Sequence, residues 1–317
     1  MQQPGTDFDE IFTPVVCYDS LRLLLALASY HRWQLQQLDI KVAFLYGIVK
    51  EEKYMQLPEG YSHGSRQNNM CAKLNRFINR LKQSPREWYH KLSSVLVPYR
   101  FTVSTFDPCV LIHKLMQFFL AVYIHDITLW GSAGNLMTST KQLLEKEFEV
   151  TDMGDLHWLI GMKIEDLEDG IAVVQTAYIH KILQCFGLGQ CNPILLPLDA
   201  NHVLCHRSEE EILDIKLYQK IIGSLMYTLT GTQPDLAFPI TLLSQYLTCP
   251  TQEHFDAIKH VFRYLQGTKK NKLFFSYSKS LVLEGFTDSN FAPCQDTRRS
   301  ISGYIFKLGG ATISWRS

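Results

Sequence analysis

Two aspartates stand inside apolar stretches of the sequence, where a carboxylate needs a partner. Asp39 follows the apolar-polar alternation of residues 33–38, and Asp126 follows the apolar run 118–124 and His125. A buried carboxylate is usually paired, protonated or bound to a metal ion. If both aspartates end neighbouring strands of one sheet, they can hold divalent cations for phosphoryl transfer. On spacing alone, the simpler interpretation of two strand-end aspartates facing water is favoured.

Hydrophobic periodicity predicts the elements that carry these residues. Residues 33–39 alternate as a half-buried strand that ends near Asp39. Residues 118–131 form two short apolar strands of a β-hairpin, with His125 and Asp126 at its tip. The two aspartates are therefore expected at strand ends.

The rest of the pattern is helical in the middle and β-rich at the end. Helices are expected over 21–30, 85–97, 141–148, 178–186, 217–228, 237–247 and 254–266. A second hairpin pairs 159–164 with 171–175, and strands follow over 281–286, 301–308 and 311–315. The sequence thus predicts an α+β fold.

Composition excludes several classes of protein. The chain has 317 residues, 46% of them hydrophobic, and 31 basic side chains balance 31 acidic ones. This balance excludes attachment to nucleic acid by bulk charge, although it permits a local basic groove. There is no run of ~18 apolar residues and no secretory signal, and the eight cysteines form no C-x-x-C pair. We expect an intracellular protein, cytoplasmic or nuclear and not secreted, without a membrane partner.

Ten short stretches carry a more specific signal. They are Phe12–Val16, Leu38–Gly47, Glu51–Gly60, Leu81–Arg86, Asp107–Val110, Tyr123–Ile127, Gly223–Tyr227, Gln233–Ala237, Arg263–Thr268 and Asp296–Tyr304. In this order they closely resemble the reverse transcriptase region of copia-type LTR retrotransposon Pol polyproteins. The resemblance covers nearly the whole chain.

The resemblance implies a right-hand polymerase architecture. Residues 1–155 would form the palm, a mixed βαββ-type sheet, with part of the fingers. Residues 156–175 would be the primer-grip hairpin and residues 176–272 the helical thumb. Residues 273–317 would be the opening β-strands of a truncated ribonuclease H-like domain.

The resemblance also assigns roles to single residues. Asp39 and Asp126 match metal-binding carboxylates of the polymerase site, which works with two Mg²⁺ ions; Mg²⁺ prefers carboxylate oxygens. Phe44 matches the aromatic that bars the ribose 2′-hydroxyl, and Gln83 matches a residue of the nucleotide pocket. The implied partners are an RNA template, a DNA primer and a dNTP.

Two departures from the family pattern fall in this site. The family's hairpin carries two adjacent aspartates, but His125 stands in place of the first. Neutral imidazole is a poor substitute for a carboxylate on Mg²⁺. Asn79 and Arg80 replace the Tyr-Gly pair that backs the incoming nucleotide, so a long side chain enters a space that favours glycine.

Two further departures concern the ends of the sequence. The family's basic strand pair of the fingers lies upstream of the part that matches Thr6–Glu10. Asp288 matches the first carboxylate of a ribonuclease H site, whose other acidic ligands lie beyond residue 317. Since one carboxylate cannot assemble a two-metal site, we expect this remnant to be inert.

A basic strip and two aromatics are candidates for nucleic-acid contact. A phosphate-contacting strip and a solvated helix face explain the basic residues equally well; they are Lys259, Arg263, Lys269, Lys270 and Lys272. Trp158 and Tyr178 could touch a primer strand, but core packing is the favoured role.

A cysteine- and histidine-rich segment invites a zinc interpretation. Its members are Cys185, Cys191, His202, Cys205 and His206. Paired spacings of the C-x₂₋₄-C kind are absent, so buried thiols and loop histidines are favoured.

The sequence therefore predicts a degenerate copia-type reverse transcriptase fragment with impaired or no activity. Two alternatives stay open. One is a noncatalytic nucleic-acid-binding module; the other is a retroelement relic without a selected function. The oligomeric state is not indicated.

Overall fold

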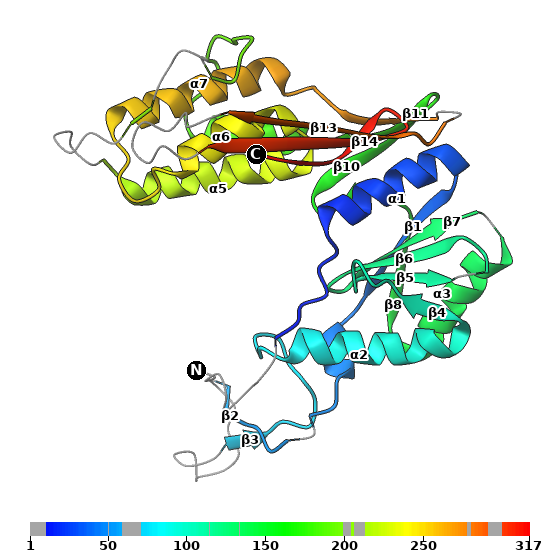
Figure 1. Ribbon diagram of the computed structural model, residues 1–317. Coiled ribbons are helices and arrows are strands. Elements are labelled where there is room, and N and C mark those ends of the chain that lie inside the picture. The colour runs from blue at the N-terminus through cyan, green and yellow to red at the C-terminus, as the bar shows by residue number, and fades with distance from the viewer. Residues whose placement is uncertain are drawn as a thin grey trace. The chain divides into compact units, whose positions relative to one another are not determined.

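The computed structural model divides the chain into two compact units (Figure 1). It describes residues 11–49, 51–58, 71–113, 115–132, 134–198, 204–205, 213–277, 280–290 and 300–317. The first unit comprises Met1–Ser20 and Trp33–Leu156, and the second comprises Leu21–Arg32 and His157–Ser317. Helices and antiparallel sheets occur in separate runs along the chain, so the predicted α+β class is confirmed.

A six-stranded sheet with the order β4-β5-β6-β7-β1-β8 forms the first unit. Its strands are β1 (Gln34–Ile40), β4 (Phe101–Val103), β5 (Val110–His113), β6 (Phe118–Tyr123), β7 (Asp126–Gly131) and β8 (Val150–Asp155). Every neighbouring pair runs antiparallel, so the prediction of a mixed sheet is wrong for these strands. Hairpins and helix-containing connections join these strands, and none of the connections places two of them side by side in parallel.

Two helices cover one face of this sheet. Trp88 of α2 (Ser84–Leu96) and Leu144 of α3 (Asn135–Glu147) share a buried cluster with Leu38 and Ile40 of β1. Because side chains alternate between the faces of a strand, Asp39 lies on the opposite face. The packing of β1 thus sends its aspartate away from the apolar core.

Smaller elements complete the first unit. They are the 3-10 helices η1 (Ala43–Tyr46) and η3 (Val97–Tyr99) and a two-stranded sheet of β2 (Tyr54–Gln56) and β3 (Cys71–Lys73). The sequence did not indicate β2, β3 or the 3-10 helices. It also predicted only the second half of α3, which begins at Asn135 and not at residue 141.

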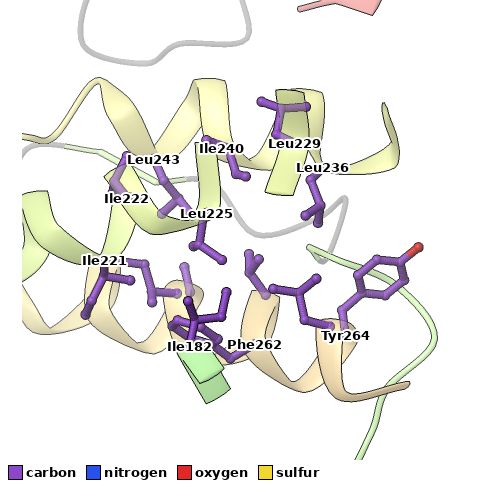
Figure 2. Packing of buried hydrophobic residues seen from close by; sticks show 14 of the residues in the cluster. Ile182, Ile221, Ile222, Leu225, Leu229, Leu236, Ile240, Leu243, Phe262 and Tyr264 are labelled. Atoms are coloured by element: carbon purple, nitrogen blue, oxygen red, sulfur yellow. The ribbon is translucent and has the colours of Figure 1, made fainter. Parts of the chain in front are cut away.

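Helices build the core of the second unit. They are α1 (Tyr18–His31), whose residues from Leu21 belong here, α4 (Thr176–Cys185), α5 (Ile215–Gly231), η4 (Pro234–Leu236), α6 (Ala237–Ser244) and α7 (Gln252–Thr268). Figure 2 shows side chains of α5, α6 and α7, among them Leu225, Ile240 and Phe262, meeting between the helices. Amphipathic spacing in these segments produces this interior.

A four-stranded sheet, in the order β12-β11-β10-β9, accompanies the helices. Its strands are β9 (Trp158–Leu159), β10 (Met162–Leu167), β11 (Gly170–Val174) and β12 (Leu273–Ser276). The β10–β11 hairpin turns over two residues, because Leu167 already pairs with Gly170. The predicted turn over residues 165–170 is therefore too long.

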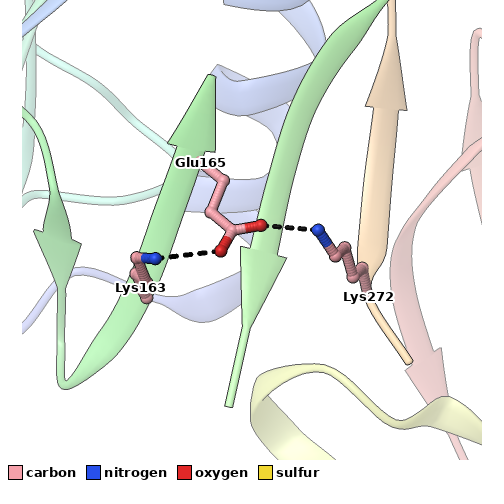
Figure 3. Close-up of polar contacts among 3 residues, drawn as sticks. All are labelled: Lys163, Glu165 and Lys272. Atoms are coloured by element: carbon pink, nitrogen blue, oxygen red, sulfur yellow. Dashed lines mark hydrogen bonds and ion pairs between the residues drawn. The ribbon is translucent and has the colours of Figure 1, made fainter. Parts of the chain in front are cut away.

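An ion-pair network lies on this sheet (Figure 3). The Glu165 carboxylate accepts a hydrogen bond of 3.0 Å from Lys163 Nζ and one of 2.6 Å from Lys272 Nζ. Since Lys272 directly precedes β12 and Glu165 lies on β10, the second bond spans β11. The network thus ties an edge strand to the hairpin.

The last part of the chain forms a three-stranded antiparallel sheet. Its strands are β13 (Leu283–Asn290), β14 (Ile301–Leu308) and β15 (Ala311–Arg316). β12, which follows the predicted boundary at residue 272, pairs with β11 and not with these strands. The four-part division into palm, primer grip, thumb and ribonuclease H-like domain stays a prediction.

Among the described residues, no helix has both the length and the apolar character needed to cross a membrane.

Candidate active site

The two candidate carboxylates lie directly opposite each other on neighbouring strands of the sheet. Asp39 on β1 is the direct ladder partner of Asp126, the first residue of β7. The neighbouring pair, Leu38 and Ile127, is buried among α2 and α3. Both aspartates therefore point to the face opposite the helices. The strand register brings together two residues that lie far apart in the sequence.

His125 joins this pair from the hairpin turn. Its Nε2 lies 3.9 Å from Asp39 Oδ1, and its side chain is 53% exposed against 34% for Asp39. One ligand atom from each of Asp39, His125 and Asp126 lies within 4.8 Å of the others. Within the described ranges, no other set of three or more His, Cys, Asp or Glu side chains meets this condition.

The electrostatics of the pair are unfavourable without a cation. Burial raises the pKa of Asp126, and the nearby Asp39 carboxylate raises it further. Two neighbours oppose this shift: the His125 imidazole and the Gln37 amide, whose Nε2 donates to Asp126 Oδ1 over 3.4 Å. Like charges directly opposite in a ladder destabilise a sheet. The site keeps them together at that cost.

The backbone of the hairpin turn is held from several sides. The Ile124 N–H donates to the Pro14 carbonyl oxygen over 2.7 Å, and the Trp88 indole donates to the Ile124 carbonyl oxygen over 2.7 Å. The Ile40 N–H donates to the His125 carbonyl oxygen over 3.0 Å. The turn is thereby fixed to β1, to α2 and to the Phe12–Val16 segment.

Ile124 itself adopts a left-handed conformation with φ of 57°. This region is rare for a β-branched residue and costs about 1–3 kcal/mol, which the surrounding structure must supply. Such strain clusters at functional sites. Sequence pattern did not indicate this conformation, because Ile has no turn preference that would reveal it.

The predicted nucleotide-pocket residues lie on consecutive segments of the first unit. Phe44, on η1, is half-buried and packs against the core of this unit. The Phe77 N–H donates to the Gly47 carbonyl oxygen over 3.1 Å, which ties η1 to the turn that carries Asn79 and Arg80. Gln83 is buried directly before α2, whereas Asn79 and Arg80 are exposed.

Arg80 occupies a backbone conformation that suits glycine. Its φ is 76°, in the left-handed region, and it lies in an exposed turn. An L-residue pays about 1–2 kcal/mol for this conformation, whereas glycine adopts it without a Cβ penalty. The turn thus keeps a glycine-like backbone but carries an arginine. The nucleotide-binding roles of Phe44, Asn79, Arg80 and Gln83 stay predictions.

Most of the predicted nucleic-acid contacts in the second unit already have partners within the chain. Lys259 Nζ donates to Asp256 Oδ1 over 2.7 Å, and Arg263 Nε donates to the Asn192 carbonyl oxygen over 2.9 Å. Lys269 contacts the side chain of the nearby Gln266, and Lys270 is exposed. These bonds favour the solvated-face interpretation for Lys259 and a loop-anchoring role for Arg263.

Trp158 corrects a sequence expectation. Its side chain is 52% exposed, so the expected core packing is wrong for this residue. It lies on β9, a two-residue strand at the edge of its sheet, which offers little to bury it. Tyr178 does pack as expected: its hydroxyl donates to the Ser224 carbonyl oxygen over 3.1 Å, and its ring meets that of Tyr227 edge-on.

The other candidates lie apart from the acidic pair in sequence. Asp288 lies exposed on β13, where its Oδ1 accepts a hydrogen bond from the Ser289 N–H. Cys185, Cys191 and Cys205 are free thiols. His202 and His206 lie outside the described residues, so the zinc interpretation is not tested.

Comparison with known proteins decides the family. A reverse transcriptase (RNA-dependent DNA polymerase) family model matches residues 1–200. The chain belongs to the reverse transcriptase family. This match and the transposon relatives described next together confirm the resemblance to copia-type Pol polyproteins. The matched range contains Asp39, His125 and Asp126.

Two of the relatives match along the whole chain. It is 36% identical to the retrovirus-related Pol polyprotein from transposon TNT 1-94 of Nicotiana tabacum, over 100% of this chain and 24% of that protein. It is 33% identical to that from transposon RE1 of Arabidopsis thaliana, over 100% of this chain and 22% of the relative. A putative transposon Ty5-1 protein of Saccharomyces cerevisiae is 25% identical over 88% of this chain and 92% of its own length. The chain thus spans about a quarter of the two plant polyproteins.

Proposed function

We propose that this chain is a copia-type reverse transcriptase region whose centre for RNA-templated DNA synthesis is impaired. One observation carries the proposal: His125 lies at the tip of the hairpin, 3.9 Å from Asp39, where the family pattern has a carboxylate. The implied partners are an RNA template, a DNA primer and a dNTP.

The donor set does not fit two Mg²⁺ ions. Two such ions carry four positive charges, whereas Asp39 and Asp126 supply two negative ones and a neutral His125 supplies none. Mg²⁺ also prefers oxygen ligands in octahedral geometry and binds imidazole poorly. Removing one preorganised donor from a catalytic site typically costs about 3–4 kcal/mol, or a factor of about 10²–10³ in rate. A loss of at least this size is expected here.

In this proposal, Arg80 is a second obstacle to nucleotide binding. It stands where the family has the glycine of its Tyr-Gly pair, and its left-handed φ of 76° supports the view that this turn is built for glycine. A long cationic side chain there would meet a nucleotide held in the family's usual pose. His125→Asp alone is therefore expected to leave activity low.

Primer extension on an RNA template tests the proposal. Wild-type protein, His125→Asp, Arg80→Gly and the double variant are compared with Mg²⁺ and with Mn²⁺. We expect extension at background level for wild-type protein and a gain only in the double variant. Robust extension by wild-type protein overturns the proposal, and full recovery by His125→Asp alone refutes the role of Arg80.

A second candidate function is nucleic-acid binding without catalysis, and the exposed Trp158 favours it. Trp158 is the direct ladder partner of Lys163, so an aromatic ring and a cation lie on one face. Beside them is a hollow of about 370 Å³, also lined by Glu165 and Tyr178. Bases stack on exposed aromatic rings, and lysines neutralise phosphates.

Binding of an RNA–DNA hybrid at several salt concentrations tests this second function. Trp158→Ala is expected to weaken binding by about 1–3 kcal/mol, whereas Trp158→Phe should retain most of it. Neutralising Lys259, Arg263 and Lys270 tests the predicted strip separately. If the Ala and Phe variants bind equally, base stacking on this residue is refuted.

A further inference from the structure

We propose that Asp39, His125 and Asp126 form a site for a single borderline transition-metal ion, with Zn²⁺ as the preferred ligand, in place of two Mg²⁺ ions. The inference deepens the proposed function, because it concerns the same side chains. Its test is separate, because the metal selectivity of the site can be measured without any assay of DNA synthesis.

The donor types favour such an ion. Zn²⁺ is bound by imidazole nitrogen and carboxylate oxygen together, at about 2.0–2.2 Å, whereas Mg²⁺ favours oxygen alone. For the same nitrogen- and oxygen-containing site, affinity rises from Mn²⁺ through Fe²⁺, Co²⁺ and Ni²⁺ to Cu²⁺ and falls again at Zn²⁺, so Zn²⁺ is favoured here by its tetrahedral, mixed nitrogen and oxygen ligand set and not by raw affinity. His125 therefore changes which metal the site selects.

The charges favour one ion and not two. One divalent cation is neutralised by Asp39 and Asp126, and neutral His125 completes the ligand set without adding charge. The cation removes the repulsion between two carboxylates that the β1–β7 register places directly opposite each other. A second divalent ion would find no further anion among these three residues.

The distances suit ligation after small side-chain rotations. Tetrahedral bonds of about 2.0 Å place neighbouring ligand atoms about 3.3 Å apart. His125 Nε2 and Asp39 Oδ1 are separated by 3.9 Å, and all three ligand atoms lie within 4.8 Å of one another. Because His125 is more than half exposed, its ring can turn without repacking the core.

The surroundings hold the backbone of the ligands in place. His125 and Asp126 follow Ile124, whose N–H and carbonyl groups are both hydrogen-bonded, and the His125 carbonyl oxygen accepts from Ile40. Gln37 donates to Asp126 Oδ1 as an outer partner of the ligand. Such outer partners orient metal ligands and raise affinity. Three protein ligands leave an open position for water.

Metal titration of the purified chain, freed of metal by a chelator, tests the inference. Calorimetric titration with ZnCl₂ and the visible absorption of bound Co²⁺ report binding directly. We expect a Zn²⁺ site that tenfold more Mg²⁺ does not displace. We expect His125→Asp to lower Zn²⁺ affinity at least about tenfold. The same variant should gain measurable Mg²⁺ binding, because it restores a third carboxylate.

Controls separate this site from other zinc ligands in the chain. His157→Asp makes the same substitution at an exposed histidine of the second unit and should leave Zn²⁺ affinity unchanged. Co²⁺ held by thiolates adds near-ultraviolet charge-transfer absorption, which the proposed site lacks. Zn²⁺ affinity that is equal in wild-type protein and His125→Asp overturns the inference, as does displacement by equimolar Mg²⁺. Neither result bears on primer extension, which tests the proposed function separately.

Discussion

Asp39 and Asp126 are direct partners in the antiparallel β1–β7 ladder, so the sheet places two carboxylates opposite each other. Stability alone would not favour this arrangement, because like charges at such a position repel. Proteins often carry stability costs of this kind where a binding site needs them. The pair is therefore the part of the first unit in which folding and function conflict most clearly.

Removing one of these charges is expected to stabilise the metal-free protein. Burial and the Asp39 charge raise the pKa of Asp126, so folding penalises its charged carboxylate and not its neutral form. Asp126→Asn mimics that form and should increase the free energy of unfolding at pH 7 by about 0.5–1 kcal/mol. Calorimetry in the presence of a chelator measures this change.

Asp152→Asn is the matched control for that substitution. Asp152, on the neighbouring strand β8, is paired with Lys141 at 2.6 Å and has no opposing carboxylate in the ladder. Its replacement should leave stability unchanged or lower it. If both asparagine variants shift the melting temperature in the same direction by the same amount, charge repulsion is not the cause.

Arg80→Gly should also stabilise the first unit. Glycine relieves the left-handed conformation of Arg80, and the greater freedom of glycine in the unfolded chain offsets part of this gain. We expect a net increase of about 0.5–1 kcal/mol in the free energy of unfolding. Arg80→Ala removes the long side chain but keeps the strain, so it should not stabilise. Equal effects of the two variants would contradict the argument from backbone strain.

Trp88→Phe is expected to loosen the hairpin tip. The substitution removes the only indole that donates to Ile124 within the described structure and leaves a partly buried carbonyl group without that donor. The cost should be about 1–3 kcal/mol of stability, with weaker metal binding at His125. Trp130→Phe is the control, because Trp130 is equally buried but donates to Thr128, away from the tip. A similar loss of metal affinity in both variants would show that the effect is general destabilisation.

The Glu165 network should make stability depend on pH. Hydrogen bonds from Lys272 and Lys163 lower the pKa of Glu165 below its ordinary value of 4.5. A carboxyl with a lowered pKa contributes stability above that ordinary value, and the contribution is lost as the pH falls through the lowered one. At pH 7, Glu165→Gln should cost about 0.5 kcal/mol, a modest amount because all three side chains are partly exposed.

Urea unfolding of wild-type protein and Glu165→Gln at several pH values measures this difference. The two curves should converge as the pH drops below 4.5. Glu168→Gln changes an exposed residue of the adjoining turn and should have no effect at any pH. A stability gap for Glu165→Gln that persists at low pH would contradict the ion-pair account.

Periodicity predicted the elements with strong patterns and missed those that depend on distant partners. The β6–β7 hairpin was visible because apolar runs flank two polar residues, although its turn consists of Ile124 and His125, and Asp126 already pairs with Tyr123 as the first residue of β7. The pairing of β12 with β11 was not, because four residues carry no information about which strand they join. Trp158 was expected in the core, but its edge position leaves it exposed.

The site shows the same division between local and tertiary information. Spacing identified Asp39 and Asp126 as unusual but did not bring them together, since their contact depends on a register between distant strands. The resemblance supplied that link. Neither approach revealed the two hydrogen bonds that hold Ile124. Its N–H donates to Pro14 and its carbonyl oxygen accepts from Trp88, and both bonds exist only in the folded structure.

The central claim is that His125 and Arg80 together impair Mg²⁺-dependent DNA synthesis at this site. The rate of the first nucleotide addition, measured in a single turnover on a primed RNA template with Mg²⁺, tests it most directly. We predict that wild-type protein adds nucleotides at least about 10²-fold more slowly than the His125→Asp, Arg80→Gly double variant. Equal rates for the two proteins would contradict the account.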